Sequence, residues 1–595
     1  MKDQPPFTLT LEPFLYGLIF AAALGLRLLN LGAHPLNDVE AREALTVLGQ
    51  LRGAGDAALG PHSPAYFFFT FFSFLLFGAR EFTARLGPAL AGAALVLAPA
   101  LFRDKLGRGG ALGAAALLAV STSLLAASRS VDGAALAVLG LSLAVGALMR
   151  FGAGGRSRWL YAAGAALGLG LASGSSFWLG ALTLALTLLA LRFTQPDVGG
   201  ALSDLGGRLR PEARTFVIIL VLTTLVIATV GLTYLRGLGA LVDNTIGWVG
   251  GFAPSSEGRP PLVVLIFLAA YEPLLVVLGI AGAVRAFRQG RRLGQALAWF
   301  SLIALALLLV YGRRGLPDIL WVTAPLGMLA GWELFESLAA NWTRADLPIA
   351  AAQAGIMAAL AGFAMLNVAS YANIIKNGGG DSTATVLGMT LQVSSGANLW
   401  VAALAVFLIF VVAYLVALGW SGMAARLGLL LSGSGLLLAM TLSAGWGLTQ
   451  LRPDSPAELW WAKPAAADVT RMLVTLGNVS DYTVGNPNDI EVTVEGPSLG
   501  VLGWALRDYK HAAFVDRLDP VIQSPVVITP SDEQNPTLGS SYVGQRFMLR
   551  AMWTPDMPPA DWIGWLVYRR IPAVEPETVI LWVRQDIQQL KSTGE

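Results

Sequence analysis

The segment LGAHPLNDVEARE (Leu31–Glu43) begins where the first long apolar run of the chain, residues 13–31, ends. Four of its last six residues are charged: Asp38, Glu40, Arg42 and Glu43. Carboxylates cost free energy when they enter the hydrocarbon of a bilayer, so an acidic cluster directly after an apolar run marks a membrane edge. This junction places the chain among membrane proteins.

The composition of the whole chain agrees with this placement. Of its 595 residues, 55% are hydrophobic and 13% are charged, and the mean hydropathy is +0.62. The hydrophobic share is higher, and the charged share is much lower, than in soluble domains. The net charge of +2 is spread over 40 basic and 38 acidic residues, whereas nucleic acid binding needs a concentrated basic face. The absence of cysteine excludes disulfides and thiolate chemistry. We predict a polytopic membrane protein whose partners include the lipid bilayer but no nucleic acid.

Thirteen apolar runs are long enough, or nearly so, to cross a bilayer, which takes about 20 residues per helix. We therefore predict an all-α membrane domain of about thirteen transmembrane helices over residues 1–448. The runs cover residues 13–31, 82–102, 110–127, 132–149, 159–173, 175–191, 214–235, 261–284, 295–311, 317–335, 348–372, 397–420 and 427–448.

One further run, HSPAYFFFTFFSFLLFG (His62–Gly78), is as apolar as these but shorter than most of them. If it crossed the membrane, it would place the Asp38 region on the cytoplasmic side. We favour the alternative, in which it lies in the membrane interface as an in-plane helix. The first outside loop then covers residues 32–81.

Basic residues alternate along the loops between the runs. The loops at 103–108, 150–158, 192–214 and 285–292 are rich in arginine, and the loops between them carry few cations. Because cytoplasmic loops are enriched in Lys and Arg, we predict a multi-pass plasma-membrane protein with a cytoplasmic N-terminus. The loop 32–81 and the C-terminal region are then extracytoplasmic.

The composition changes after Thr449, where charged residues and proline become more frequent. The segments DIEVTVEG, SPVVITPS and ETVILWVRQ have the pattern of strands, whereas AADVTRMLVTLG and LGVLGWALRDY have the pattern of helices. We predict that residues 449–595 form a soluble, extracytoplasmic α/β domain. Pattern alone indicates only a lid or an acceptor-recognition role for it.

Further polar residues are predicted on the same face as Asp38. His62 opens the aromatic run, SRSVDG places Arg129 and Asp132 at one span boundary, and YGRRGLPD places Arg313 and Arg314 at another. Acids and arginines that converge at one membrane face suit an anionic lipid headgroup and a proton-accepting base.

The order of these elements resembles the membrane glycosyltransferases of the GT-C superfamily, in the branch of the protein O-mannosyltransferases and the lipid A aminoarabinose transferases. It resembles especially a prokaryotic subgroup described as flippase-activity-associated. The similarity covers about residues 13–335, and FTARLGPALAGAALVL and RRGLPDILWVTAPLGMLAGWEL carry it with the motifs above. It implies transfer of a sugar from a polyprenyl-phosphate-linked donor to a glycan, lipid or protein acceptor outside the membrane.

The resemblance also implies residue roles. Glu40 matches the Glu of the family's acidic pair, Arg42 matches a residue that contacts the carrier phosphate, and Asp132 matches a second acid. Val39 occupies the position of the catalytic Asp, so the carboxylate is either displaced to Asp38 or missing from the site. Asp38 or Glu40 is then the expected base, with Asp38 favoured and Glu40 expected to orient Arg42. The resemblance assigns Arg129, Arg313, Arg314 and His62, which stands in place of a lysine, to substrate binding.

Two other functions stay open on the sequence alone. A non-catalytic relative that binds a polyprenyl-phosphate lipid, or assists glycan assembly or flipping, is suggested by Val39 and the lost lysine. A transporter is disfavoured because the chain lacks two matching halves with paired broken helices. A divalent cation near His62 is possible, but three histidines in the whole chain predict no dedicated metal site.

Overall fold

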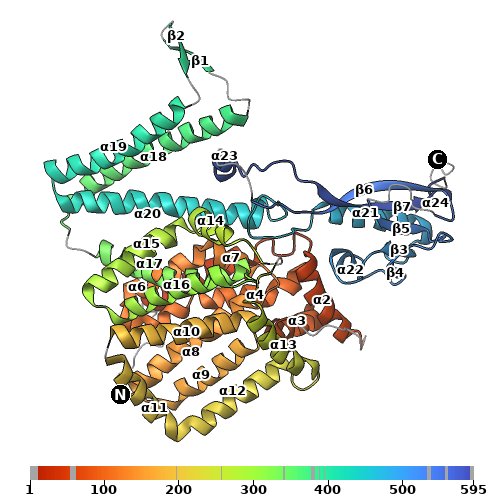
Figure 1. The fold of residues 1–595 in the computed structure, drawn as a ribbon, viewed down its shortest axis with the longest axis horizontal. Helices are drawn as coiled ribbons and strands as arrows, with labels where there is room; N and C mark the ends of the chain where they lie inside the picture. Colours follow the sequence, from red (N-terminus) through yellow and green to blue (C-terminus); the bar gives the residue numbers. More distant parts are fainter. Residues whose placement is uncertain are drawn as a thin grey trace, which may run out of the picture.

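The computed structural model describes residues 11–53, 62–195, 197–255, 258–339, 342–376, 382–386, 389–393, 396–531, 538–555 and 561–589. Residues 1–10 of the predicted membrane domain and residues 54–61 of the predicted outside loop lie outside these ranges. Figure 1 shows a helical bundle with an α/β domain beside α2 (Asp38–Leu51) and α3 (Pro64–Phe77) at one end.

Each of the thirteen predicted runs contains a helix. Their bounds are α1 (Leu11–Leu28), α4 (Glu81–Leu95), α6 (Arg108–Val120) with α7 (Thr122–Ser128), α8 (Ala134–Gly154), α9 (Ser157–Leu171), α10 (Ser175–Thr194), α12 (Ala213–Ala228), α14 (Pro261–Tyr271) with α15 (Pro273–Gln289), α16 (Arg292–Val310), α17 (Leu320–Leu338), α18 (Asp346–Lys376), α19 (Ala397–Gly419) and α20 (Gly422–Trp446).

Within the described ranges, nine helices are long and apolar enough to cross a membrane, or up to eleven if each bent pair is one span. The predicted runs at 159–173 and 317–335 do not reach this standard. Helix α9 has only 15 residues, and α17 carries Glu333 and Glu336, which lower its hydropathy. The chain is a multi-pass helical membrane protein, and its described part holds nine to eleven candidate spans.

Shorter elements connect the spans. Their bounds are η1 (Ala98–Phe102), α5 (Arg103–Leu106), α11 (Asp197–Leu209), η2 (Arg210–Glu212), α13 (Arg236–Gly250), η3 (Leu316–Ile319), the π-helical η4 (Gly447–Leu451) and the hairpin β1 (Ser382–Val386) and β2 (Met389–Val393). Helix α3 has 14 residues, about 21 Å at 1.5 Å per residue, which is short of the roughly 30 Å hydrocarbon core. Its length suits the predicted in-plane position.

Two spans are broken, and their breaks meet. The chain bends by 59° between α6 and α7 and by 92° between α14 and α15, where Pro273 supplies no backbone N–H. The fully buried Glu272 stands at the second break. Its Oε1 atom accepts hydrogen bonds of 2.6 Å each from Ser121 Oγ, Ser123 Oγ and Ser123 N. One carboxylate therefore satisfies donors at the start of α7.

Small residues allow the helices to approach closely, as is usual in membranes. At the crossing of α6 and α17, a Cβ on Gly331 would come within 2.1 Å of the backbone of Ala114. This crossing therefore requires glycine at position 331.

The C-terminal domain is built on a five-stranded sheet with the order β4-β3-β5-β7-β6. Strand β3 runs parallel to β4 and β5, whereas β7 is antiparallel to β5 and β6. All five predicted segments form the expected kind of element, so the α/β prediction is confirmed; β4, β6, α23 and α24 were not predicted. The bounds are α21 (Asp468–Val484), β3 (Val492–Glu495), α22 (Val501–Ala505), β4 (Ala512–Val515), β5 (Val526–Pro530), β6 (Tyr542–Ala551), α23 (Asp561–Tyr568), β7 (Pro576–Arg584) and α24 (Gln585–Gln589).

Candidate functional site

Helix α2 orients the acidic cluster. Asn37 caps the helix: its side chain accepts hydrogen bonds from the backbone N–H groups of Val39 and Glu40, and the Glu40 carboxylate accepts one from Asn37 N. Residues three apart lie on the same face of a helix, so Glu40 and Glu43 both point inward and are buried, whereas Val39 is 64% exposed.

Glu40 holds the first loop to the bundle. It forms an ion pair with Arg85 of α4, with an Oε2–Nη2 distance of 2.6 Å, and it accepts a 3.0 Å hydrogen bond from Val131 N. Arg85 also donates to the backbone carbonyls of Leu31, His34 and Pro35. The side chains of Glu40 and Arg85 are both buried. Their contacts are those of an ion pair that holds the first loop in place.

Asp38 points toward the C-terminal domain. It forms an ion pair with Arg550 of β6 and accepts a 3.2 Å hydrogen bond from Val501 N, at the start of α22. The structure therefore separates Asp38 from the other predicted site residues and places it in the contact between the two domains.

Glu43 faces a different group of residues. Its Oε1 atom contacts His62 Nδ1, and the backbone N–H of His62 donates to the same oxygen at 3.3 Å. The other oxygen, Oε2, is buried and has no hydrogen-bond partner in the described ranges, as is also true of the neighbouring Arg42 Nε. The hydrogen bond that the His62 ring donates to Glu43 raises the pKa of His62. These three side chains form a polar cluster with unused hydrogen-bonding capacity.

Asp132 lies beside this cluster. Its Oδ1 atom accepts a 2.6 Å hydrogen bond from Ala134 N at the start of α8. Burial raises the pKa of Asp132, and the nearby Glu43 adds to this effect while His62 opposes it. His62 thus lies near Arg42, Glu43 and Asp132, and Glu43 is a member of this group whose role the sequence left unassigned.

The cluster continues toward α10 and α17. Asp318 in η3 is close enough to Asp132 for their negative charges to repel, and it accepts a 2.6 Å hydrogen bond from Ser176 Oγ. Trp321 Nε1 donates to the same hydroxyl at 3.1 Å. Asp318 lies in the YGRRGLPD segment. Its closeness in the sequence to Arg313 and Arg314 was the signal that could have identified it as a candidate site residue.

The remaining predicted arginines contact backbone carbonyls. Arg129 is buried, and its guanidinium donates to carbonyls at the end of α1, including Arg27 O at 2.9 Å, and to Thr449 O. Arg314 donates to carbonyls at the end of α16 and to Arg259 O at 2.6 Å. Arg313 is exposed, and its backbone N–H donates to Gly251 O. Arg129 and Arg314 therefore stabilise helix ends.

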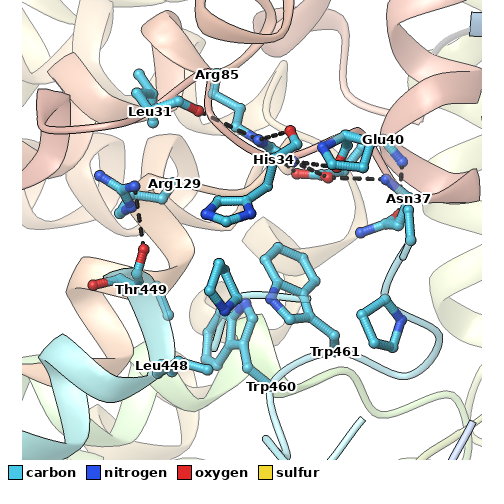
Figure 2. A pocket seen from close by; sticks show the side chains of 15 residues that line it. Leu31, His34, Asn37, Glu40, Arg85, Arg129, Leu448, Thr449, Trp460 and Trp461 are labelled. Carbon is cyan, nitrogen blue, oxygen red and sulfur yellow. Dashed lines mark hydrogen bonds and ion pairs between the residues drawn. The ribbon is translucent and has the colours of Figure 1, made fainter. Parts of the chain in front are cut away.

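Figure 2 shows a small cavity beside Glu40, with Arg85 and Arg129 along one wall and Trp460 and Trp461 along the opposite wall. It encloses about 40 Å³, enough for one or two water molecules. The cavity is too small for a lipid headgroup or a sugar, so Glu40, Arg85 and Arg129 line a solvent-sized space.

A larger, apolar cavity of about 400 Å³ lies between α8, α10, α16 and α17. Trp321 lines it near the polar cluster, and Lys105 and Arg292 line it near the predicted cytoplasmic loops. Because Trp321 also bonds to Ser176, the apolar cavity adjoins the Ser176–Asp318 pair. Among the described residues, no group of three or more His, Asp or Glu side chains is arranged to hold a metal ion.

Comparisons with known proteins identify the fold. Residues 61–196 match the model of the dolichyl-phosphate-mannose-protein mannosyltransferase family, whereas no curated protein sequence matches the chain. The structure of ArnT from Cupriavidus metallidurans bound to undecaprenyl phosphate is 15% identical, with a TM-score of 0.50 over 96% of this chain and 97% of that one. The same protein in the apo state is 15% identical, with a TM-score of 0.51 over 97% and 99%. The chain therefore has the GT-C fold, the fold of a superfamily of membrane-embedded glycosyltransferases.

Proposed function

We propose that the chain transfers a sugar from a polyprenyl-phosphate-linked donor to an acceptor at the extracytoplasmic face of the membrane. The observation that carries this proposal is the junction between the 400 Å³ apolar cavity and the polar cluster. A lipid-linked sugar needs these two environments side by side. The ArnT structure with bound undecaprenyl phosphate supports the same class of ligand.

Arg42 and His62 are the proposed ligands of the donor phosphate. A buried donor without a partner, such as Arg42 Nε, costs free energy, and a phosphate oxygen would satisfy it. Guanidinium groups hold phosphate through directed hydrogen bonds. The hydrogen bond to Glu43 raises the pKa of His62, so the imidazolium that would stand in for the family's lysine persists to higher pH than in a free histidine.

Glu43 and Asp132 are the proposed carboxylates of the reaction. The acceptor hydroxyl gives its proton to one of them, most directly to the unpartnered Oε2 atom of Glu43. The acceptor oxygen bonds to the anomeric carbon as the bond from that carbon to the phosphate oxygen breaks, and the polyprenyl phosphate leaves. A base must be within hydrogen-bond reach of the acceptor, and the contacts of Asp38 with Arg550 and Val501 favour Glu43 over Asp38 for this role.

A non-catalytic protein that binds a polyprenyl-phosphate lipid is the second candidate. The observation that favours it is Val39, which stands at the family's Asp position and is 64% exposed. Both candidates require lipid binding, and only the first requires turnover of the donor.

The test uses purified protein in liposomes with undecaprenyl-phosphate-linked mannose, glucose or aminoarabinose and an envelope extract as acceptor, with donor consumption followed by mass spectrometry. Glu43→Gln and Asp132→Asn should each lower the rate by about a hundredfold or more. Arg42→Ala should weaken binding of undecaprenyl phosphate by about tenfold, or about 1.4 kcal/mol. Asp481→Asn, at an exposed residue of the C-terminal domain, is the control.

Each outcome distinguishes the candidates. Binding without donor consumption for every sugar would support the non-catalytic protein. Loss of transfer in Asp38→Asn with normal transfer in Glu43→Gln would return the base to Asp38, the residue that the sequence favoured.

A further inference from the structure

A second apolar groove lies on the outside of the bundle, between α15 and α20. It encloses about 530 Å³, and its walls are mainly aliphatic: Val277, Leu278, Leu427, Leu429, Leu430 and Leu437. Val277 and Leu429 are exposed, so this part of the groove faces the lipid. It lies on helices other than those around the cavity assigned to the donor tail.

The groove is polar at one end only. Arg285, Ser337, Trp342 and Arg426 line that end, beside the loops that the charge pattern predicts to be cytoplasmic. The charge of Arg285 is neutralised by Glu333, which it contacts through two hydrogen bonds of 2.6 and 2.7 Å. Arg426 is exposed, and no acidic side chain of the described residues pairs with it. Arg426 therefore supplies a cation at the polar end that no ion pair within the described residues neutralises.

Trp342 adds a second feature of a membrane interface. Its Nε1 atom donates to Leu338 O at 2.8 Å, which fixes the indole at the end of α17. Tryptophan is enriched where the headgroups meet the hydrocarbon. The groove thus runs from headgroup level, at Arg426 and Trp342, into the hydrocarbon along α15 and α20.

We propose that this groove binds a phospholipid with an anionic headgroup, with one acyl chain along the aliphatic walls and the phosphate at Arg426. The aliphatic walls match the chain, and the unneutralised guanidinium of Arg426 at the polar end matches the headgroup. The proposal depends on the membrane fold but not on sugar transfer.

The glycines of α20 provide a direct test. A Cβ on Gly433, which lines the groove, would meet no atom within 4 Å, and the same is true of Gly435, which lies outside it. Leucine at either position gives the helix the same change in propensity. Only Gly433→Leu places a side chain in the groove.

Lipid binding is measured by native mass spectrometry on protein titrated with phosphatidylglycerol or phosphatidylcholine. We expect the wild type to prefer phosphatidylglycerol, Arg426→Gln to weaken its binding by about fivefold, and Gly433→Leu to abolish the specific adduct. Gly435→Leu and Arg344→Gln, at an exposed arginine near Trp342, should bind as the wild type does. Equal binding of both lipids, or equal losses in Gly433→Leu and Gly435→Leu, would overturn the proposal.

Discussion

Replacing Arg85 by methionine tests whether Glu40 holds the first loop in place or takes part in the reaction. Arg85 makes two contacts with the Glu40 carboxylate, at 2.6 and 3.2 Å, and three with the carbonyls of Leu31, His34 and Pro35. In Arg85→Met, the Glu40 carboxylate keeps only the backbone donors Asn37 N and Val131 N. It becomes a buried charge without a counter-ion.

Loss of one partner of a buried ion pair costs about 3–5 kcal/mol. With an unfolding entropy of roughly 2.1 cal/mol/K per residue, a loss of about 4 kcal/mol lowers the melting temperature of a chain of 595 residues by about 3 °C. Thermal unfolding in detergent, followed by tryptophan fluorescence, measures this shift. Arg85→Met/Glu40→Leu removes both charges and should recover most of the lost stability.

The double variant also separates structure from chemistry. If it is stable and still consumes donor, Glu40 acts by positioning the loop, as its contacts indicate. A stable double variant without turnover would show that the Glu40 carboxylate is needed in the reaction. An unchanged melting temperature in Arg85→Met would refute the structural role of the pair.

Two further predictions concern His62 and the domain contact. Glu43 raises the pKa of His62, so binding of undecaprenyl phosphate should be full below the ordinary imidazole value of about 6.5 and be lost as the pH rises through the raised pKa. Glu43→Gln should move this loss to lower pH and His62→Lys should remove it, whereas pH-independent binding in the wild type would contradict the assignment. Trp504 is 2% exposed, stacks on Phe74 at 5.9 Å and donates to Glu81 at 2.8 Å, so Trp504→Ala should weaken domain docking by about 3–5 kcal/mol. Faster limited proteolysis of the C-terminal domain would reveal this, with the 79% exposed Trp400 replaced by alanine as the control.

The helices could be predicted from hydropathy because membrane spans must be long and apolar. The meeting of the breaks in two of them could not, since Ser121 opens a short polar triplet, Glu272 is a single acid within an apolar run, and their partnership depends on helix packing. Glu272–Pro273 was the one local signal of a break.

The acidic cluster was found from the sequence, but the direction of each carboxylate depends on distant residues. The Asn37 cap sets the rotation of α2, Arg85 binds Glu40 from 45 positions away, and Asp38 receives a hydrogen bond from a residue 463 positions away. The role of an arginine is equally hard to predict from the sequence. Arg129 and Arg42 both stand beside acids in the sequence, yet only the structure shows that Arg129 donates to carbonyls and that Arg42 retains an unused donor.

The meeting of the two broken spans has a consequence for how the protein is made. Glu272 is synthesised 151 residues after Ser121, a delay of roughly 8 to 30 s at translation rates of about 5–20 residues per second. During that interval the start of α7 lacks its acceptor, and each unsatisfied backbone donor in lipid costs several kcal/mol. The first broken helix therefore completes its hydrogen bonds only after the second has been made.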